Sequence, residues 1–275
     1  MPAGFMINTS DSPLIVTAIH DGHEMHQAVL PYMQLQEHER FREEDPYTAL
    51  LADLPANQVV VRISRFQTDL NRTRDKAIYL TPEDAWGLQV WNQSVPDTVK
   101  ELSYRFYDDF YRAMQDLISE VIQQYGKFIV LDIHSYNHRR EKPDQTAPAE
   151  ENPEINVGTG HNRPQWQALS DRFIRFLSHT TINGNRPDVR ENVKFKGGGF
   201  AQWINTHYGD YGCVLSVECK KTFMDEWTGR VYPAHLADIR QALLASLPCL
   251  LDELEQINTK SDDKRRKENH QSPCR

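Results

Sequence analysis

The chain has little cysteine and no long apolar run. Its 275 residues include four cysteines, which are scattered and never spaced as CxxC. This spacing argues against a disulfide framework and against a cysteine-based zinc site, and it favours a reduced, cytoplasmic compartment. The longest apolar runs are the length of strands, far below the roughly 18 residues that a membrane helix needs, so we expect no membrane span.

An excess of positive charge is also lacking. The chain carries 31 Lys and Arg residues against 39 Asp and Glu residues, a formal net charge of -8. Because phosphate contacts need a basic surface, this balance argues against a nucleic-acid partner, although a local basic pocket for a small anion stays compatible with it. Residues 1–13 lack a basic region followed by an apolar core, so we expect no signal peptide.

What the chain does have is an alternation of short apolar runs and amphipathic segments, typical of a layered α/β protein with a largely parallel sheet. Residues 1–12 are expected to be loose, and residues 35–46 to form a charged surface loop or helix. Strands are predicted at 14–19, 59–63, 128–133 and 213–217, with shorter ones near 156–160 and 193–195. Helices are predicted at 96–124, 166–177, 200–207 and 235–255.

These elements fit one domain over residues 13–257. A chain of this length is long enough to cover both faces of a sheet. Residues 258–275 are charged and polar, so we predict a disordered tail there.

Polar side chains recur where the predicted strands end, and two histidines among them suggest a metal. His20 and Glu24 share a tight loop after the first strand, and His134 follows the apolar strand 128–133. Two histidines and one carboxylate are a common catalytic zinc set that leaves a fourth position for water. His23 is the alternative to Glu24, since His20-x-x-His23 is also a workable spacing. Asp132 is a candidate for orienting a liganding histidine.

A second group of candidates lies in residues 62–72, which gather three arginines, an aspartate and an asparagine after a strand. A guanidinium binds a carboxylate through two parallel hydrogen bonds, and an asparagine amide can orient the same group. Arg65, Asn71 and Arg72 are therefore candidates for binding an anionic substrate, with Asp69 holding an arginine in place. The alternative is a solvated charged loop.

A third candidate is Glu218, which ends the apolar run 213–217. A glutamate at such a strand end can act as the general base that takes a proton from a metal-activated water. The alternative is a carboxylate paired with Lys220 or Lys221 at the edge of the sheet.

Taken together, five segments resemble the N-formylglutamate amidohydrolase family in the right order, from about Pro13 to Leu251. The departures are Ile19, where the family has proline before the first histidine, His26, where the family has proline after the position of Met25, and Lys221, where arginine is usual. The five segments are Ile19–Met25, Arg62–Arg72 with its Asp-x-Asn-Arg ending, the Asp-x-His-Ser of residues 132–135, the Lys-Gly-Gly of residues 196–198, and Glu218–Glu226.

The resemblance implies a three-layer α/β/α fold with a central mixed, largely parallel sheet, of the zinc carboxypeptidase or phosphorylase/hydrolase type. It implies a Zn²⁺ ion held by His20, Glu24 and His134. It also implies a hydrolase that cleaves the amide bond of an N-acyl amino acid similar to N-formyl-L-glutamate.

For the remaining residues the resemblance implies Glu218 as general base and Asn71 and Arg72 as ligands of the substrate carboxylate. Arg65 would face the carbonyl oxygen or a second carboxylate, and Asp69 and Lys196 would lie on the substrate side. Two alternatives stay open: a metallocarboxypeptidase acting on acidic peptides or poly-glutamate tails, and an inactive carboxylate-binding protein.

Overall fold

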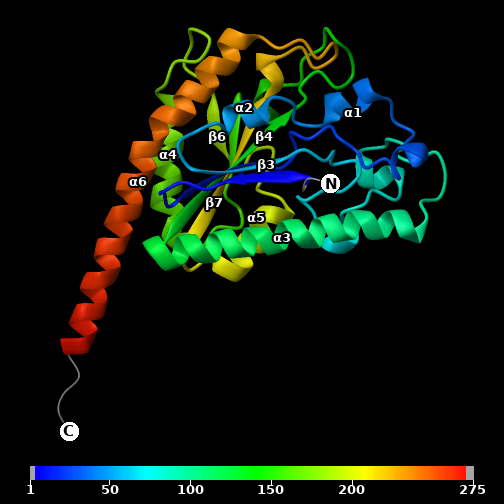
Figure 1. Cartoon of the computed structure of the whole chain (residues 1–275). Helices are drawn as coiled ribbons and strands as arrows, with labels where there is room; N and C mark the ends of the chain where they lie inside the picture. The colour runs from blue at the N-terminus through cyan, green and yellow to red at the C-terminus, as the bar shows by residue number, and fades with distance from the viewer. Residues whose placement is uncertain (1–3, 271–275) are drawn as a thin grey trace.

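A single seven-stranded sheet forms the centre of the computed structural model, which describes residues 4–270, with side chains described as far as residue 257 (Figure 1). The strand order is β1-β3-β2-β4-β7-β5-β6. The strands are β1 (Phe5–Asn8), β2 (Leu14–Ala18), β3 (Asn57–Val61), β4 (Phe128–Tyr136), β5 (Ile155–Gly158), β6 (Val189–Glu191) and β7 (Gly212–Lys220). The α-helices are α1 (Glu37–Glu43), α2 (Thr48–Leu51), α3 (Asp97–Tyr125), α4 (Gln167–Ser178), α5 (Gly199–Tyr208) and α6 (Pro233–His270).

Most strand pairs are parallel. The pairs β3–β2, β2–β4, β4–β7 and β5–β6 are parallel, whereas β1–β3 and β7–β5 are antiparallel. The prediction of a mixed, largely parallel sheet is therefore confirmed. No helix in residues 4–270 combines the length and the apolar character that crossing a bilayer requires.

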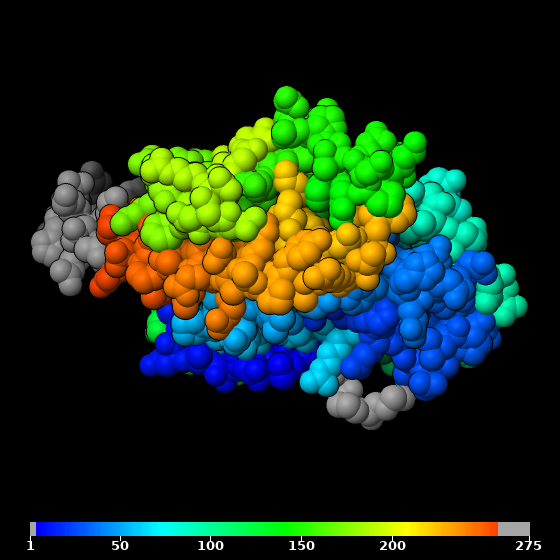
Figure 2. Space-filling view, turned by 90° about the horizontal axis from the view of Figure 1, so that it is seen from above, coloured from blue at the N-terminus to red at the C-terminus, as the bar shows by residue number. Residues whose placement is uncertain are grey.

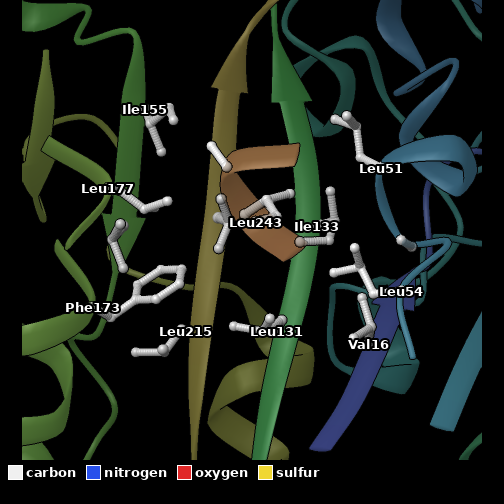
Figure 3. Close-up of a cluster of buried hydrophobic side chains, with 14 of the residues drawn as sticks. Val16, Leu51, Leu54, Leu131, Ile133, Ile155, Phe173, Leu177, Leu215 and Leu243 are labelled. Carbon is white, nitrogen blue, oxygen red and sulfur yellow. The ribbon is translucent and has the colours of Figure 1, made fainter. Parts of the chain in front are cut away.

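Helices cover both faces of the sheet and make the three layers. On one face α2, α4 and α6 enclose a core in which Phe173 and Leu243 meet Leu131 and Leu215 of the central strands (Figure 3). On the other face α3 and α5 pack over Val130 and Val214. Seen from above, α6 lies in a band between α4 and the N-terminal part of the chain (Figure 2). The apolar alternation of the strands thus fixes which residues face which helices.

Three elements differ from the sequence-based expectation. Residues 5–8 form a strand, because Phe5 and Ile7 alternate inward and the segment pairs antiparallel with β3. The short sixth strand lies at Val189–Glu191 instead of 193–195. Helix α6 continues through residues 258–270, where a disordered tail was expected, and residues 271–275 of that tail lie outside the described part of the chain.

The two central strands are longer than predicted, and this places two site residues inside the sheet. Since β4 and β7 stay paired to Tyr136 and Lys220, His134 lies opposite Glu218 in the register. Strand alternation puts Asp132 and His134 on the same face as Val130, and Glu218 on the same face as Val214. The carboxyl ends of β2, β4 and β7 therefore present these side chains to one region.

Candidate active site

Two histidines and an aspartate converge beyond the ends of β2 and β4. Oδ2 of Asp45 lies 3.0 Å from Nδ1 of His134 and 3.5 Å from Nδ1 of His20. One ligand atom from each of the three residues lies within 4.8 Å of the others, and all three side chains are buried. Nδ1 of His20 has no hydrogen-bond partner although it is buried. A buried nitrogen aimed at another imidazole and a carboxylate fits a divalent cation well.

Separate carboxylates hold the opposite side of each imidazole. Nε2 of His20 donates to Asp69 at 2.7 Å, and Nε2 of His134 donates to Asp132 at 2.9 Å. Asp132 in turn accepts a hydrogen bond from Thr17 Oγ1 at 2.6 Å. Metal-binding histidines commonly have such partners, which fix the ring orientation and make the other nitrogen a better ligand. The arrangement leaves Nδ1 of both rings facing Asp45.

Asp45 reaches the site because the chain after α1 folds back onto the first loop. Its backbone N–H donates to the carbonyl of His20 at 2.9 Å. Burial by itself would raise the pKa of Asp45, but the hydrogen bond to His134 and the positive charges of His20 and His134 hold the pKa well below its usual value. Asp45 is therefore an anion at neutral pH, as a metal ligand must be.

Neither Glu24 nor His23 belongs to this group. Glu24 is exposed, and its backbone is bonded to Arg62 and Ser64 at the end of β3. Gly22 permits this close approach, since a Cβ there would lie 2.3 Å from the Arg62 carbonyl carbon. His23 turns away as well, and its Nδ1 bonds to Glu44 at 2.6 Å. The expected set of His20, Glu24 and His134 is not brought together, and Asp45 stands in the third position.

Glu218 faces the same space from β7. Burial raises the pKa of its carboxyl to about 8, against the opposing effect of the positive charge on His134. The sequence-based alternative, a pair with Lys220 or Lys221, does not form: Lys220 Nζ donates to the carbonyl of Asn152, and Lys221 Nζ donates to the carbonyls of Arg42 and Glu44. The Glu218 carboxyl thus lies in the cavity with a perturbed pKa, as acid–base groups do.

The opposite wall is cationic and is organised around Asp69. Arg65 donates to Asp69 Oδ2 at 2.9 Å and to the Tyr79 hydroxyl at 3.1 Å, and Tyr79 also donates to Asp69. Burial would raise the pKa of Asp69, but the positive charges of Arg65 and His20 hold the pKa well below its usual value. Asp69 therefore links the guanidinium of Arg65 to the imidazole of His20 instead of facing the substrate space alone.

Asn71 and Arg72 continue this wall. Oδ1 of Asn71 accepts the N–H of Phe200 at the start of α5, and a Cβ at Gly198 would collide with the Asn71 amide. Asn71 is thereby fixed with its Nδ2 as the remaining donor. The Arg72 guanidinium lies 3.6 Å from Asp69 and donates to the carbonyl of Asp84, and a third of the side chain is exposed.

These groups line one cavity of about 260 Å³. The cavity also contains side chains that the sequence analysis did not assign to the site, notably Asp45, Trp86 and Arg140. Lys196 is exposed and does not line it. No local pattern marks Asp45 or Arg140, because each stands in a charged, loop-like stretch that looks solvated in the sequence.

Comparison with known proteins identifies the family. The model of the N-formylglutamate amidohydrolase family matches residues 12–224, most of the chain. The chain belongs to the N-formylglutamate amidohydrolase family. The resemblance drawn from the five sequence segments is thus confirmed, and the amidohydrolase family supports a hydrolase. No curated protein sequence matches the chain.

Two solved structures share this fold. An N-formylglutamate amidohydrolase from Ralstonia eutropha superposes with a TM-score of 0.71 at 14% identity, covering 94% of this chain and 99% of that chain. A gene product of Agrobacterium tumefaciens superposes with a TM-score of 0.67 at 18% identity, covering 92% of this chain and 96% of that chain. A metallo-carboxypeptidase from Pseudomonas aeruginosa has a lower TM-score of 0.38 at 17% identity, covering 91% of this chain and 61% of that chain.

Proposed function

We propose that the protein is a zinc-dependent amidohydrolase that cleaves the amide bond of an N-acyl amino acid of the N-formyl-L-glutamate type. The observation that carries the proposal is the convergence of His20 Nδ1, His134 Nδ1 and Asp45 Oδ2 beside the Glu218 carboxyl. His20, His134 and Asp45 would hold the cation. A zinc ion there would supply Lewis acidity, polarising a carbonyl group and lowering the pKa of water.

The charge of the cavity favours an anionic substrate. Four cationic side chains and four carboxylates line it, namely Arg65, Arg72, Arg140 and Lys221 against Glu43, Asp45, Asp69 and Glu218. A divalent cation would add two positive charges to this balance. In the proposal Asn71 Nδ2 and the Arg72 guanidinium bind the carboxylate of the amino-acid part, since a guanidinium and an amide suit that group.

In the proposed reaction Glu218 acts as a carboxylate, the form that a cation held by His20, His134 and Asp45 would favour, and takes a proton from the attacking water. The water oxygen adds to the amide carbon, and the negative charge that develops on the carbonyl oxygen faces the Arg65 guanidinium. Glu218 then delivers its proton to the leaving nitrogen, and the C–N bond breaks. The products are a short carboxylic acid and a free amino acid, so that one water is consumed for each amide bond.

The test combines metal analysis with a hydrolysis assay. We expect about one zinc per chain in the wild-type protein and its loss in His134→Ala. N-formyl-L-glutamate and related N-acyl amino acids would be screened for release of the free amine. Glu218→Gln should keep its zinc and lose about 10²- to 10⁴-fold in kcat, the usual contribution of a general acid–base group.

The outcomes separate the alternatives. Hydrolysis of peptides that end in glutamate, without hydrolysis of N-acyl amino acids, would replace the proposal with a metallocarboxypeptidase. A protein that takes up no zinc when it is supplied, and cleaves neither class, would be an inactive carboxylate-binding protein.

A further inference from the structure

Asp45 is the one proposed metal ligand that comes from a connection between helices. His134 lies within β4 and His20 follows β2 closely, whereas Asp45 lies in residues 44–47, between α1 and α2. The ligands of a metal site must be held to within about 0.5 Å of the right geometry. The connection 44–47 therefore needs contacts of its own that keep the Asp45 carboxylate facing the two histidines.

Backbone groups supply part of this hold. The Asp45 N–H donates to the carbonyl of His20 at 2.9 Å, and the Asp45 carbonyl accepts the Thr48 hydroxyl at 2.7 Å. Lys221 Nζ donates to the carbonyl of Glu44 at 2.6 Å. These bonds fix the path of the main chain on both sides of Asp45.

The side chain of Glu44 ties the same connection to two other segments. It is fully buried, its Oε2 accepts a hydrogen bond from His23 Nδ1 at 2.6 Å, and its Oε1 accepts the Ser64 hydroxyl. The Arg40 guanidinium of α1 lies 3.7 Å from Oε1. His23 belongs to the loop after β2 and Ser64 follows β3, so one carboxylate joins both strand ends to the connection that carries Asp45.

This bridge is better suited to setting a direction than to adding stability. Replacing a buried ionic group with apolar side chains is often neutral or stabilising, so a buried carboxylate is weak evidence for stability. A carboxylate bonded through both oxygens is, however, fixed in orientation. The backbone of Glu44 is extended, and successive side chains of an extended chain point to opposite sides. Holding Glu44 against His23 and Ser64 thus turns Asp45 the other way, toward the histidines of the site.

We infer that Glu44 is a positioning residue for the third metal ligand, and that His23 and Ser64 act through it. His23, which the sequence offered as an alternative metal ligand, serves the site by holding the carboxylate next to Asp45 and not by contact with the ion. The inference rests on the proposed function, because it requires that Asp45 binds a cation.

The test measures affinity for Zn²⁺ by competition with a chelator, with no hydrolysis assay. Glu44→Gln keeps the shape of the side chain but loses its charge and one acceptor, so we expect zinc affinity about 10- to 100-fold lower. Ser64→Ala and His23→Phe each remove one bond to Glu44 and should lower the affinity by a smaller factor. The matched controls are Glu37→Gln and His38→Phe, at exposed positions of α1, which should bind zinc as the wild type does.

A double-mutant cycle separates positioning from a general loss of structure. If Glu44 acts through Asp45, Glu44→Gln should change zinc affinity by less than about twofold when it is added to Asp45→Asn. The visible absorption of Co²⁺ bound in place of zinc depends on the ligands and their geometry, so Glu44→Gln should alter it toward the spectrum of Asp45→Asn. A merely structural role would lower the Tm of the metal-free protein and leave zinc affinity and the Co²⁺ spectrum unchanged, which would overturn the inference.

The outcomes also distinguish this inference from the proposed reaction. If Glu44→Gln does not fold, Ser64→Ala still decides, because it removes only one hydroxyl, and wild-type affinity in both Ser64→Ala and His23→Phe would then overturn the positioning role. Zinc binding that depends on Glu44, without hydrolysis of any N-acyl amino acid, would end the proposed function and support the positioning role. A wild-type protein that binds no zinc would overturn both.

Discussion

At the scale of single residues, the contacts of Nε2 in the two imidazoles indicate a metal site as clearly as the contacts of Nδ1 do. His20 and His134 each present Nδ1 to Asp45 while Nε2 is bonded to a separate buried carboxylate. Three carboxylates around two histidines would be costly in a merely structural core, because buried charges need compensation. A cation among His20, His134 and Asp45 would provide it.

The third ligand can be tested with two substitutions. We expect Asp45→Asn to weaken zinc binding by more than the roughly 10- to 100-fold that follows from losing a hydrogen-bond partner behind a ligand. Glu24→Gln should bind zinc as the wild type does, because the Glu24 side chain is exposed and lies outside the group. Metal titration with a competing chelator measures the zinc affinity of both variants. Loss of zinc in Glu24→Gln alone would restore the set expected from the sequence.

The partner behind His134 gives a graded prediction. Asp132→Asn should weaken zinc affinity about 10- to 100-fold, because the amide makes a poorer acceptor for the His134 N–H. Thr17→Val should also weaken zinc affinity, but by a smaller factor, since Thr17 donates a hydrogen bond to Asp132 and does not contact His134. The same titration checks this series. Equal affinity in all three proteins would mean that His134 needs no support from Asp132.

At the scale of elements, α6 is held to the sheet by its apolar side. Leu243 is fully buried against β4 and β7 (Figure 3). Leu251 on the same helix is 38% exposed. We expect Leu243→Ala to lower the free energy of unfolding by about 2–5 kcal/mol, through lost burial and the cavity left behind. Leu251→Ala should change it by less than about 0.5 kcal/mol. Urea unfolding of both variants measures the difference, and equal effects would contradict this packing.

Most elements could be predicted from local pattern, and the exceptions have a physical cause. The strands near residues 14, 59, 128 and 213 are continuous apolar runs, which any buried parallel strand requires. The ends of β4 and β7 were placed too early, because His134 and Glu218 are polar and look like loop residues. Pairing between the two strands continues through them. Polar residues at the end of a strand can be assigned to that strand only once their partners on the neighbouring strand are known.

At the scale of the whole molecule, Lys221 joins the end of β7 to the segment after α1. Its ammonium donates to the carbonyls of Arg42 and Glu44, and the side chain is 1% exposed. Burial lowers the pKa of Lys221 from 10.5 to about 8. This contact holds Asp45, the next residue after Glu44, against the sheet.

The lowered pKa makes stability depend on pH. Between about pH 8 and 10.5 the unfolded chain holds a proton on Lys221 that the folded chain has lost, so the free energy of unfolding should rise with pH, by about 3 kcal/mol over the window. Below pH 8 both states are protonated and this contribution is flat. Lys221→Met should lack the rise, and Lys142→Met, at an exposed position, should retain it.

Urea unfolding of the three proteins at several pH values measures that slope. Parallel curves for the wild type and Lys221→Met would show that Lys221 titrates normally in the folded protein.

The sequence by itself determined the α/β class, the family, and the histidines and glutamate at the ends of three strands, because apolar periodicity and short motifs are local properties of a chain. Only the tertiary structure decided that Asp45 and not Glu24 faces the histidines, that Lys196 lies outside the cavity and that Arg140 lies within it. Those positions depend on contacts between distant segments, such as the bond from Asp45 N–H to the His20 carbonyl and the hold of Glu226 on the loop after β4. Such contacts form between residues far apart in the chain, so no local pattern encodes them.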